Sequence, residues 1–172
     1  MASIKIATLN CRGLLSPAKR RRLNMFVKQH RVDVLLLQET HATDNSTMTE
    51  IENEWGMRGY WSLGSYQSKG VAIVFKSSLN VTHNCHFSDS DGRLVVVNMK
   101  IGDENFRLIN IYAPNKARER YNFFKAVEDR LHAPGIRVLV AGDFNCVEDA
   151  SLDRVTTPGN RTVFYDIKLL TE

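Results

Sequence analysis

The segment 32–41, VDVLLLQETH, indicates the fold class of the chain. Apolar residues occupy consecutive positions here instead of alternate ones, a pattern typical of a β-strand that is covered on both faces. The run stops at Gln38, and Glu39 follows it directly. A strand covered on both faces needs a packed layer on each side, so the segment predicts a sheet inside an α/β domain.

Strand and helix patterns alternate at both ends of the chain, and strand patterns fill the middle. The segment 4–9 alternates apolar and polar residues as a strand does, and Ser16 and Pro17 then favour a helix start. Turns that contain glycine or aspartate join the middle strands, which is typical of antiparallel hairpins. The predicted helices are 17–30, 47–54, 117–131 and 160–170, and the predicted strands are 4–10, 32–38, 59–63, 71–75, 94–101, 106–112 and 137–141.

These elements predict an α/β fold of two stacked mixed β-sheets flanked by helices, a four-layer α/β sandwich. The 172 residues suit one domain, and no apolar run approaches the ~18 residues that a membrane helix needs. The amino terminus lacks the apolar core of a secretory signal, which predicts an intracellular protein. A net charge of +4 and a pI near 9.0 fit a polyanionic partner such as nucleic acid.

Three features that resemble sites are predicted to have structural roles. Cys11, Cys85 and Cys146 are odd in number and lack Cys-x-x-Cys spacing, so we expect free thiols, with packing roles for Cys11 and Cys146. The segment 83–86, HNCH, is predicted to be a loop and not a zinc site. The basic run 19–22, KRRR, is predicted to be the solvated outer face of the first helix rather than a nucleic-acid patch.

Several predicted strands end in a polar side chain, which is where α/β domains place their sites. Taken singly, Asn10 reads as a turn residue, Tyr112 as a packed ring, and Asp143 with Asn145 as an Asx-type turn. Glu39 differs because it follows a buried strand, and a buried unpaired charge needs a cation, a metal ion or a proton. Oxygen ligands from Glu, Asp and Asn suit Mg²⁺ or Mn²⁺. The four strand ends therefore predict a metal-assisted site.

Four strings carry a family resemblance: TLNCRG, LLLQETH, INIYAPN and VAGDFN, in this order. They resemble the endonuclease/exonuclease/phosphatase superfamily, which includes apurinic endonucleases and pancreatic deoxyribonuclease. The strings SPAKRRRL, DGR at 91–93 and SLDR at 151–154 are similar to the endonuclease domains of non-LTR (LINE-type) retrotransposons. The resemblance implies a Mg²⁺-dependent phosphodiesterase that nicks DNA, lies in the nucleus and is fused to a reverse transcriptase.

The resemblance also implies a role for each site residue. Glu39 would be the metal ligand, and Asp143 would orient and activate the attacking water. Tyr112 would hydrogen-bond the phosphate. The implied site residues are Asn10, Glu39, Tyr112, Asp143 and Asn145, with Asn115 touching the substrate backbone.

The C-terminal motifs of the family are missing, since no histidine follows Asn145. We therefore expect residues 1–172 to be one domain that is incomplete at its C-terminal end, with an exposed sheet edge able to pair with another chain. Two alternatives to the endonuclease stay open. One is a non-catalytic remnant that binds nucleic acid or protein, and the other is a phosphatase or phosphodiesterase of the same superfamily.

Overall fold

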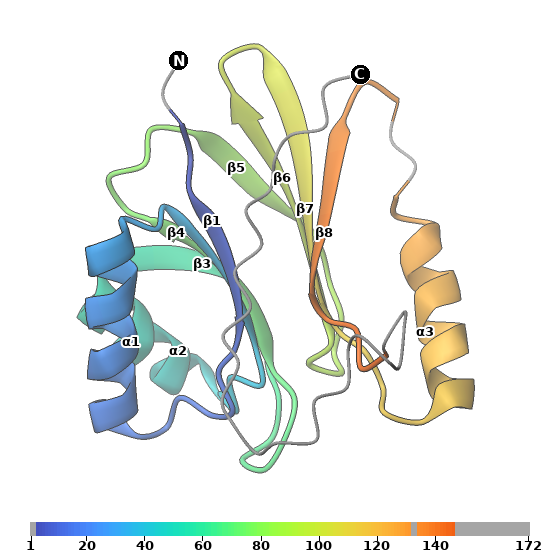
Figure 1. Ribbon diagram of the computed structural model, residues 1–172, viewed down its shortest axis with the longest axis horizontal. Coiled ribbons are helices and arrows are strands. Elements are labelled where there is room, and N and C mark those ends of the chain that lie inside the picture. Colours follow the sequence, from blue (N-terminus) through green and yellow to red (C-terminus); the bar gives the residue numbers. More distant parts are fainter. Residues whose placement is uncertain (1–2, 132–133, 147–172) are drawn as a thin grey trace, which may run out of the picture.

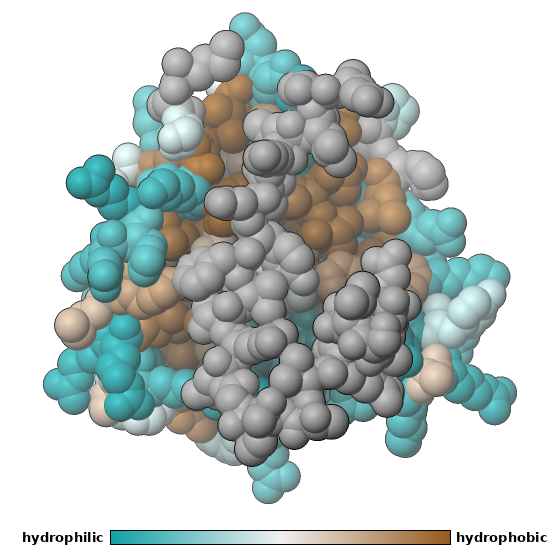
Figure 2. All heavy atoms as spheres, in the orientation of Figure 1, coloured by the Kyte–Doolittle hydropathy of each residue, from teal (hydrophilic) through white to brown (hydrophobic). Residues whose placement is uncertain are grey.

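The computed structural model describes residues 3–131 and 134–146, which form two four-stranded β-sheets stacked face to face with helices on the outside (Figure 1). Apolar residues gather over the middle of the molecule, and polar residues lie along its outer sides (Figure 2). The predicted α/β sandwich of mixed sheets is confirmed. Within the described ranges, no helix is long and apolar enough to cross a membrane.

The first sheet has the strand order β1-β2-β4-β3 and carries two helices on its outer face (Figure 1). Every residue of its central strand β2 is buried, as the apolar run predicts. Leu35 and Leu37 face the core under the helices, whereas Val34 and Leu36 face the second sheet. The elements are β1 (Ile6–Asn10), α1 (Pro17–His30), β2 (Val34–Gln38), α2 (Asn45–Trp55), β3 (Met57–Ser62) and β4 (Val71–Lys76).

The second sheet has the order β5-β6-β7-β8, with one helix on its outer face (Figure 1). Its last two strands are parallel, whereas the others pair antiparallel. In the first sheet β1 and β2 are likewise parallel. Each sheet thus has one parallel pair whose carboxyl ends lie at the same edge. The elements are β5 (Thr82–Ser88), β6 (Leu94–Ile101), β7 (Glu104–Tyr112), α3 (Ala117–Glu128) and β8 (Arg137–Asp143).

One strand was not predicted from the sequence. The segment 83–86, predicted to be a loop, lies in the edge strand β5, which pairs with β6 and is irregular between Cys85 and Phe87. Mostly exposed side chains leave such an edge strand without an apolar pattern. His83 stacks on Phe75 with ring centroids 4.0 Å apart, so its role is packing. The predicted helix 160–170 lies outside the described residues.

The prediction of a fully solvated basic run is wrong for Arg20. Only 2% of this residue is exposed, and its guanidinium forms ion pairs of 2.7 Å with Glu50 and 2.8 Å with Glu54. The run lies on α1, whose neighbour α2 supplies both carboxylates. All three cysteines are free, as predicted, but Cys146 is exposed, so its predicted packing role is wrong.

Replacing Arg20 with methionine is expected to lower the free energy of unfolding by about 1–3 kcal/mol. The change removes the charge-assisted hydrogen bonds to both glutamates and leaves the carbonyl of Leu14 without its 3.2 Å partner. Urea denaturation measures the effect. The exposed neighbour Arg21, changed to methionine, is the matched control and should stay within about 0.5 kcal/mol of the parent protein. Equal losses in the two variants would contradict the structural role of Arg20.

Candidate active site

The polar side chains that end the parallel strands converge at one end of the stacked sheets. Strand register places Asn10 beside Gln38 in the first sheet and Tyr112 beside Asp143 in the second. The inner row of each strand starts with an apolar residue and ends at this end with a polar one. The rows are Ile6-Thr8-Asn10, Val34-Leu36-Gln38, Leu108-Asn110-Tyr112 and Leu139-Ala141-Asp143.

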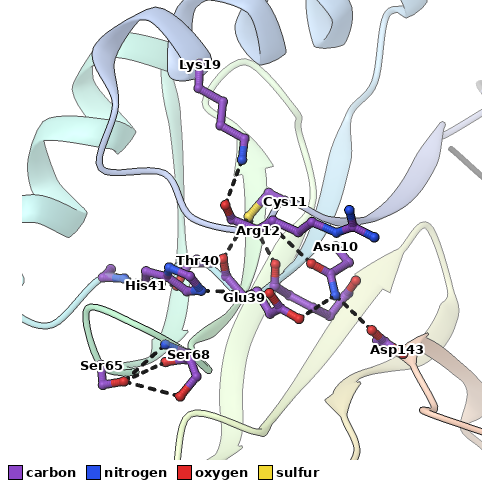
Figure 3. Close-up of polar contacts among 12 residues, drawn as sticks. Asn10, Cys11, Arg12, Lys19, Glu39, Thr40, His41, Ser65, Ser68 and Asp143 are labelled. Atoms are coloured by element: carbon purple, nitrogen blue, oxygen red, sulfur yellow. Dashed lines mark hydrogen bonds and ion pairs between the residues drawn. The ribbon is translucent and has the colours of Figure 1, made fainter. Parts of the chain in front are cut away.

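Asn10 joins two carboxylates that come from different sheets (Figure 3). Its Nδ2 donates to Glu39 Oε1 at 2.9 Å and to Asp143 Oδ2 at 2.8 Å. The backbone N–H of Arg12 donates to Asn10 Oδ1 at 3.1 Å, which fixes the orientation of the amide. A single amide therefore uses both of its N–H groups to hold two negative groups together across the sheets.

Asp143 and Asn145 form the expected turn and remain part of the site. The N–H of Asn145 donates to Asp143 Oδ1 at 3.0 Å, and Asn145 Nδ2 donates to the carbonyl of Ala113 at 2.6 Å. The turn thus uses one oxygen of Asp143, while the other oxygen meets Asn10. The predicted Asx-type turn is therefore present, and Asp143 lies in the cluster with Asn10.

The Tyr112 hydroxyl faces the two carboxylates. Burial, a hydrogen bond to Glu39 and the charges of Glu39 and Asp143 together raise the pKa of Tyr112 to about 12. Arg93 opposes the shift, since its guanidinium lies 5.3 Å from the centre of the Tyr112 ring and donates to the Tyr112 carbonyl at 3.0 Å. The phenol therefore stays protonated at neutral pH, and its hydrogen bond with the Glu39 carboxylate makes it a donor at the site.

The loops that carry these side chains adopt unusual backbone angles. Arg12, Glu39, His41 and Asn145 have φ values of 45°, 51°, 57° and 48°, in the left-handed region that non-glycine residues seldom adopt. A regular strand would point Glu39 to the face opposite Gln38, and the turn at Glu39 instead brings its carboxylate to Asn10. Such strain persists only where neighbouring structure holds it, and it concentrates at functional sites.

A glycine contact holds the loop after β2 in place. The N–H of Thr40 donates to the carbonyl of Gly70 at 3.0 Å, and the N–H of Gly70 donates to the carbonyl of Gly92 at 2.9 Å. A Cβ atom on Gly70 would lie 2.3 Å from Thr40 Oγ1, and its φ is +89°. Only glycine fits this close approach.

Replacing Gly70 with alanine is expected to cost about 1–3 kcal/mol more than the same change at Gly102. Both glycines have positive φ, but a Cβ on Gly102 would have no atom within 4 Å. The difference between the variants therefore isolates the clash with buried Thr40. Thermal and urea unfolding measure it. Equal losses would show that the loop beside Glu39 has room to move.

The structure brings together most, but not all, of the residues predicted from the sequence. Asn10, Glu39, Tyr112 and Asp143 share direct contacts, and Asn145 joins them through Asp143. Asn115 is exposed, and no recorded contact within the described ranges links its side chain to this cluster. Its backbone carbonyl accepts a 2.8 Å hydrogen bond from Arg120.

Three neighbours of the site were missed as functional candidates. His41 Nε2 lies 3.8 Å from Glu39 Oε2 and has no hydrogen-bond partner within the described part of the chain. Gln38 and Asn110 are fully buried polar residues behind the carboxylates. A polar residue inside an apolar strand, as in VLLLQ and LINIY, was the signal that could have identified the last two.

The donor chemistry of the cluster fits a hard divalent cation. Among the residues that the structure describes, no group of three His, Cys, Asp or Glu side chains gathers as a metal site. Two carboxylates do converge, on Glu39 and Asp143, and the Nδ2 of Asn10 donates a hydrogen bond to each of them. Mg²⁺ is commonly held by one or two carboxylates, with water and substrate phosphate completing its shell.

A protein-family model and a curated relative each match most of the chain. The model of the endonuclease/exonuclease/phosphatase family matches residues 7–164. The Transposon TX1 uncharacterized 149 kDa protein of Xenopus laevis is 28% identical over 154 residues, which cover 86% of this chain and 11% of that protein. The chain thus spans a small part of this curated relative.

Two solved structures illustrate the similarity of the fold. TDP2 of D. rerio, in complex with a single-strand DNA product, is 21% identical with a TM-score of 0.61, covering 86% of this chain and 62% of that one. The endonuclease domain of TRAS1, a telomere-specific non-LTR retrotransposon, is 19% identical with a TM-score of 0.60, covering 84% and 62%. At these identities the likeness concerns the fold.

Proposed function

The chain belongs to the endonuclease/exonuclease/phosphatase family, and on that premise we propose that it hydrolyses phosphodiester bonds in DNA and nicks one strand. One observation carries the proposal. Asn10 Nδ2 donates a hydrogen bond to Glu39 and another to Asp143 at the end of the two sheets where these strands stop. The protonated hydroxyl of Tyr112 lies beside them. Paired carboxylates with a neutral donor beside them suit in-line hydrolysis of a phosphate ester.

Each site residue has its own proposed role in the reaction. Asp143 accepts a hydrogen bond from a water molecule, aims it at phosphorus and takes its proton as the new P–O bond forms. The P–O bond to the 3′-oxygen, opposite the attacking water, breaks. The leaving 3′-oxygen then takes a proton from solvent and becomes a 3′-hydroxyl. Tyr112 and the amide of Asn145 hydrogen-bond the phosphate oxygens. Glu39 would hold Mg²⁺, and a bound ion there would supply positive charge to offset the negative charge on the phosphate and the leaving oxygen.

DNA is the proposed substrate, and the net charge of +4 favours a polyanion. The D. rerio TDP2 structure contains a DNA product, and the Xenopus relative is a transposon protein. In a retrotransposon, a nick with a 3′-hydroxyl would prime DNA synthesis by a reverse transcriptase fused to this domain. Such a reaction would take place on chromosomal DNA in the nucleus.

A plasmid assay tests the proposal. Supercoiled DNA incubated with the chain and Mg²⁺ should convert to nicked circles, and EDTA should stop the conversion. Sealing of the nicks by DNA ligase would identify 3′-hydroxyl and 5′-phosphate ends. DNA binding without nicking, across Mg²⁺ and Mn²⁺ concentrations, would instead support the non-catalytic alternative.

A further inference from the structure

We propose that Gln38 and Asn110 form a buried clamp that sets the distance between the two halves of the site. Both are positioning residues, one on β2 of the first sheet and the other on β7 of the second. The inference rests on the proposed function for its kinetic consequence. Its structural core is a polar contact that crosses the apolar interior directly behind the carboxylates.

The clamp gives hydrogen-bond partners to both buried amide nitrogens and to Asn110 Oδ1. Gln38 is 1% exposed and Asn110 is 0% exposed. Gln38 Nε2 donates to Asn110 Oδ1 at 2.6 Å, and Asn110 Nδ2 donates across the sheets to the carbonyls of Leu37 and Ala72, each at 2.8 Å. Gln38 Nε2 also lies 3.0 Å from Thr8 Oγ1. The two amides thereby connect β1, β2 and β4 of the first sheet to β7 of the second.

Stability alone does not require this arrangement. The rows that contain Gln38 and Asn110 are otherwise apolar where the sheets meet, and Leu36 and Leu108 precede them on the same face. An apolar pair of similar volume at these positions can be as stable as a satisfied polar pair, because buried amides lose their hydration. What an apolar pair lacks is direction: it allows the sheets to slide, whereas hydrogen bonds fix one alignment.

The alignment that the clamp fixes is that of the site. Gln38 precedes Glu39 and pairs in register with Asn10, so it anchors both first-sheet members. Asn110 lies two residues before Tyr112 and pairs with Ala141, two residues before Asp143. A slip of about 1 Å between the sheets would stretch the bond from Asn10 to Asp143, and displacements of that size can lower a rate by ~10²-fold.

The decisive variant is the double substitution Gln38→Leu with Asn110→Leu, compared with Asn110→Leu alone. The single change removes the nearest acceptor of Gln38 Nε2 and the side-chain donor of two buried carbonyls, and it should destabilise the fold. The double change also removes the Gln38 amide, so it should recover part of that stability even though the carbonyls of Leu37 and Ala72 still lack the Asn110 donor. We expect its kcat for plasmid nicking to fall by ~10²-fold while its KM for DNA stays unchanged. Recovery of both stability and kcat in the double variant would overturn the inference.

Tyr60 supplies a matched control. Its hydroxyl on β3 donates to the carbonyl of His83 on β5 at 3.1 Å, which is another hydrogen bond between the sheets. In the first sheet β3 is the strand farthest from β1. Tyr60→Phe should therefore leave kcat unchanged. If it lowers kcat as much as the double change does, the effect is general loosening and the clamp has no special role.

Two further measurements keep the inference separate from the proposed function. Should the double variant fail to fold, Gln38→Met, which is nearly isosteric, replaces it, and an unchanged kcat then overturns the inference. If the parent protein does not nick DNA, the proposed function fails. The NMR signals of the Asn10 carboxamide then test whether the clamp positions the site. Signals that shift in the double variant and not in Tyr60→Phe support it, and unchanged signals overturn it.

Discussion

Replacing Asp143 with alanine is expected to lower kcat for DNA nicking by about 10²–10⁴-fold, the range for loss of a positioned acid–base group. The carboxylate lies at the end of β8, where Asn10 and the N–H of Asn145 each hold one of its oxygens. Alanine removes the acceptor for the water proton and also one of the two carboxylates that accept hydrogen bonds from Asn10. Initial rates of plasmid nicking, measured with enzyme in excess, report the effect.

Asp103 is the matched control for this change. It is exposed in the turn between β6 and β7, and β7 runs from that turn to the site. Asp103→Ala removes the same charge from the chain at the far end of the strand. Its nicking rate should equal that of the parent protein. A similar loss in both variants would mean that net charge, and not the position of Asp143, controls the reaction.

Replacing Glu39 with glutamine is expected to lower nicking by about 10²-fold or more, because a bound metal ion contributes several kcal/mol of charge stabilisation. The glutamine oxygen can still accept the 2.9 Å hydrogen bond that Asn10 donates to Glu39. The change therefore removes charge and keeps the geometry. A titration of Mg²⁺ against nicking rate should require much higher concentrations for the variant.

Stability provides a readout of metal binding that does not depend on activity. A ligand that binds only the folded protein raises its stability, so Mg²⁺ should raise the Tm of the parent protein. The Glu39→Gln variant should show little increase, and the exposed control Glu128→Gln should behave as the parent protein does. Equal Mg²⁺-induced shifts in all three proteins would contradict the assignment of Glu39 as the ligand.

The fold could be predicted wherever burial leaves a pattern in the sequence. Strand β2 was predicted because both of its faces are covered and its apolar run is continuous. Strand β5 was missed because an edge strand with exposed side chains has little apolar pattern to detect. Arg20 was misjudged because its two carboxylate partners lie on another helix, 30 and 34 positions further along the chain.

The sequence indicated most of the residues that converge at the candidate site, but only part of their geometry. Polar residues at strand ends identified Asn10, Glu39, Tyr112 and Asp143, because parallel pairs end at the same edge of a sheet. The bridge made by Asn10 depends on how the two sheets stack, which no local pattern encodes. The contact between Gln38 and Asn110 depends on the same stacking, because these residues lie 72 positions apart in the sequence.

The nicking of supercoiled plasmid by three proteins tests the central claim most directly. That claim is that Glu39 and Asp143, held together by Asn10 across two sheets, cut DNA with Mg²⁺. We predict nicked circles with the parent protein and Mg²⁺, and loss of at least ~10²-fold in rate with Asp143→Ala and with Glu39→Gln. Nicking that persists undiminished in both variants, or a folded parent protein that nicks no DNA, would contradict it.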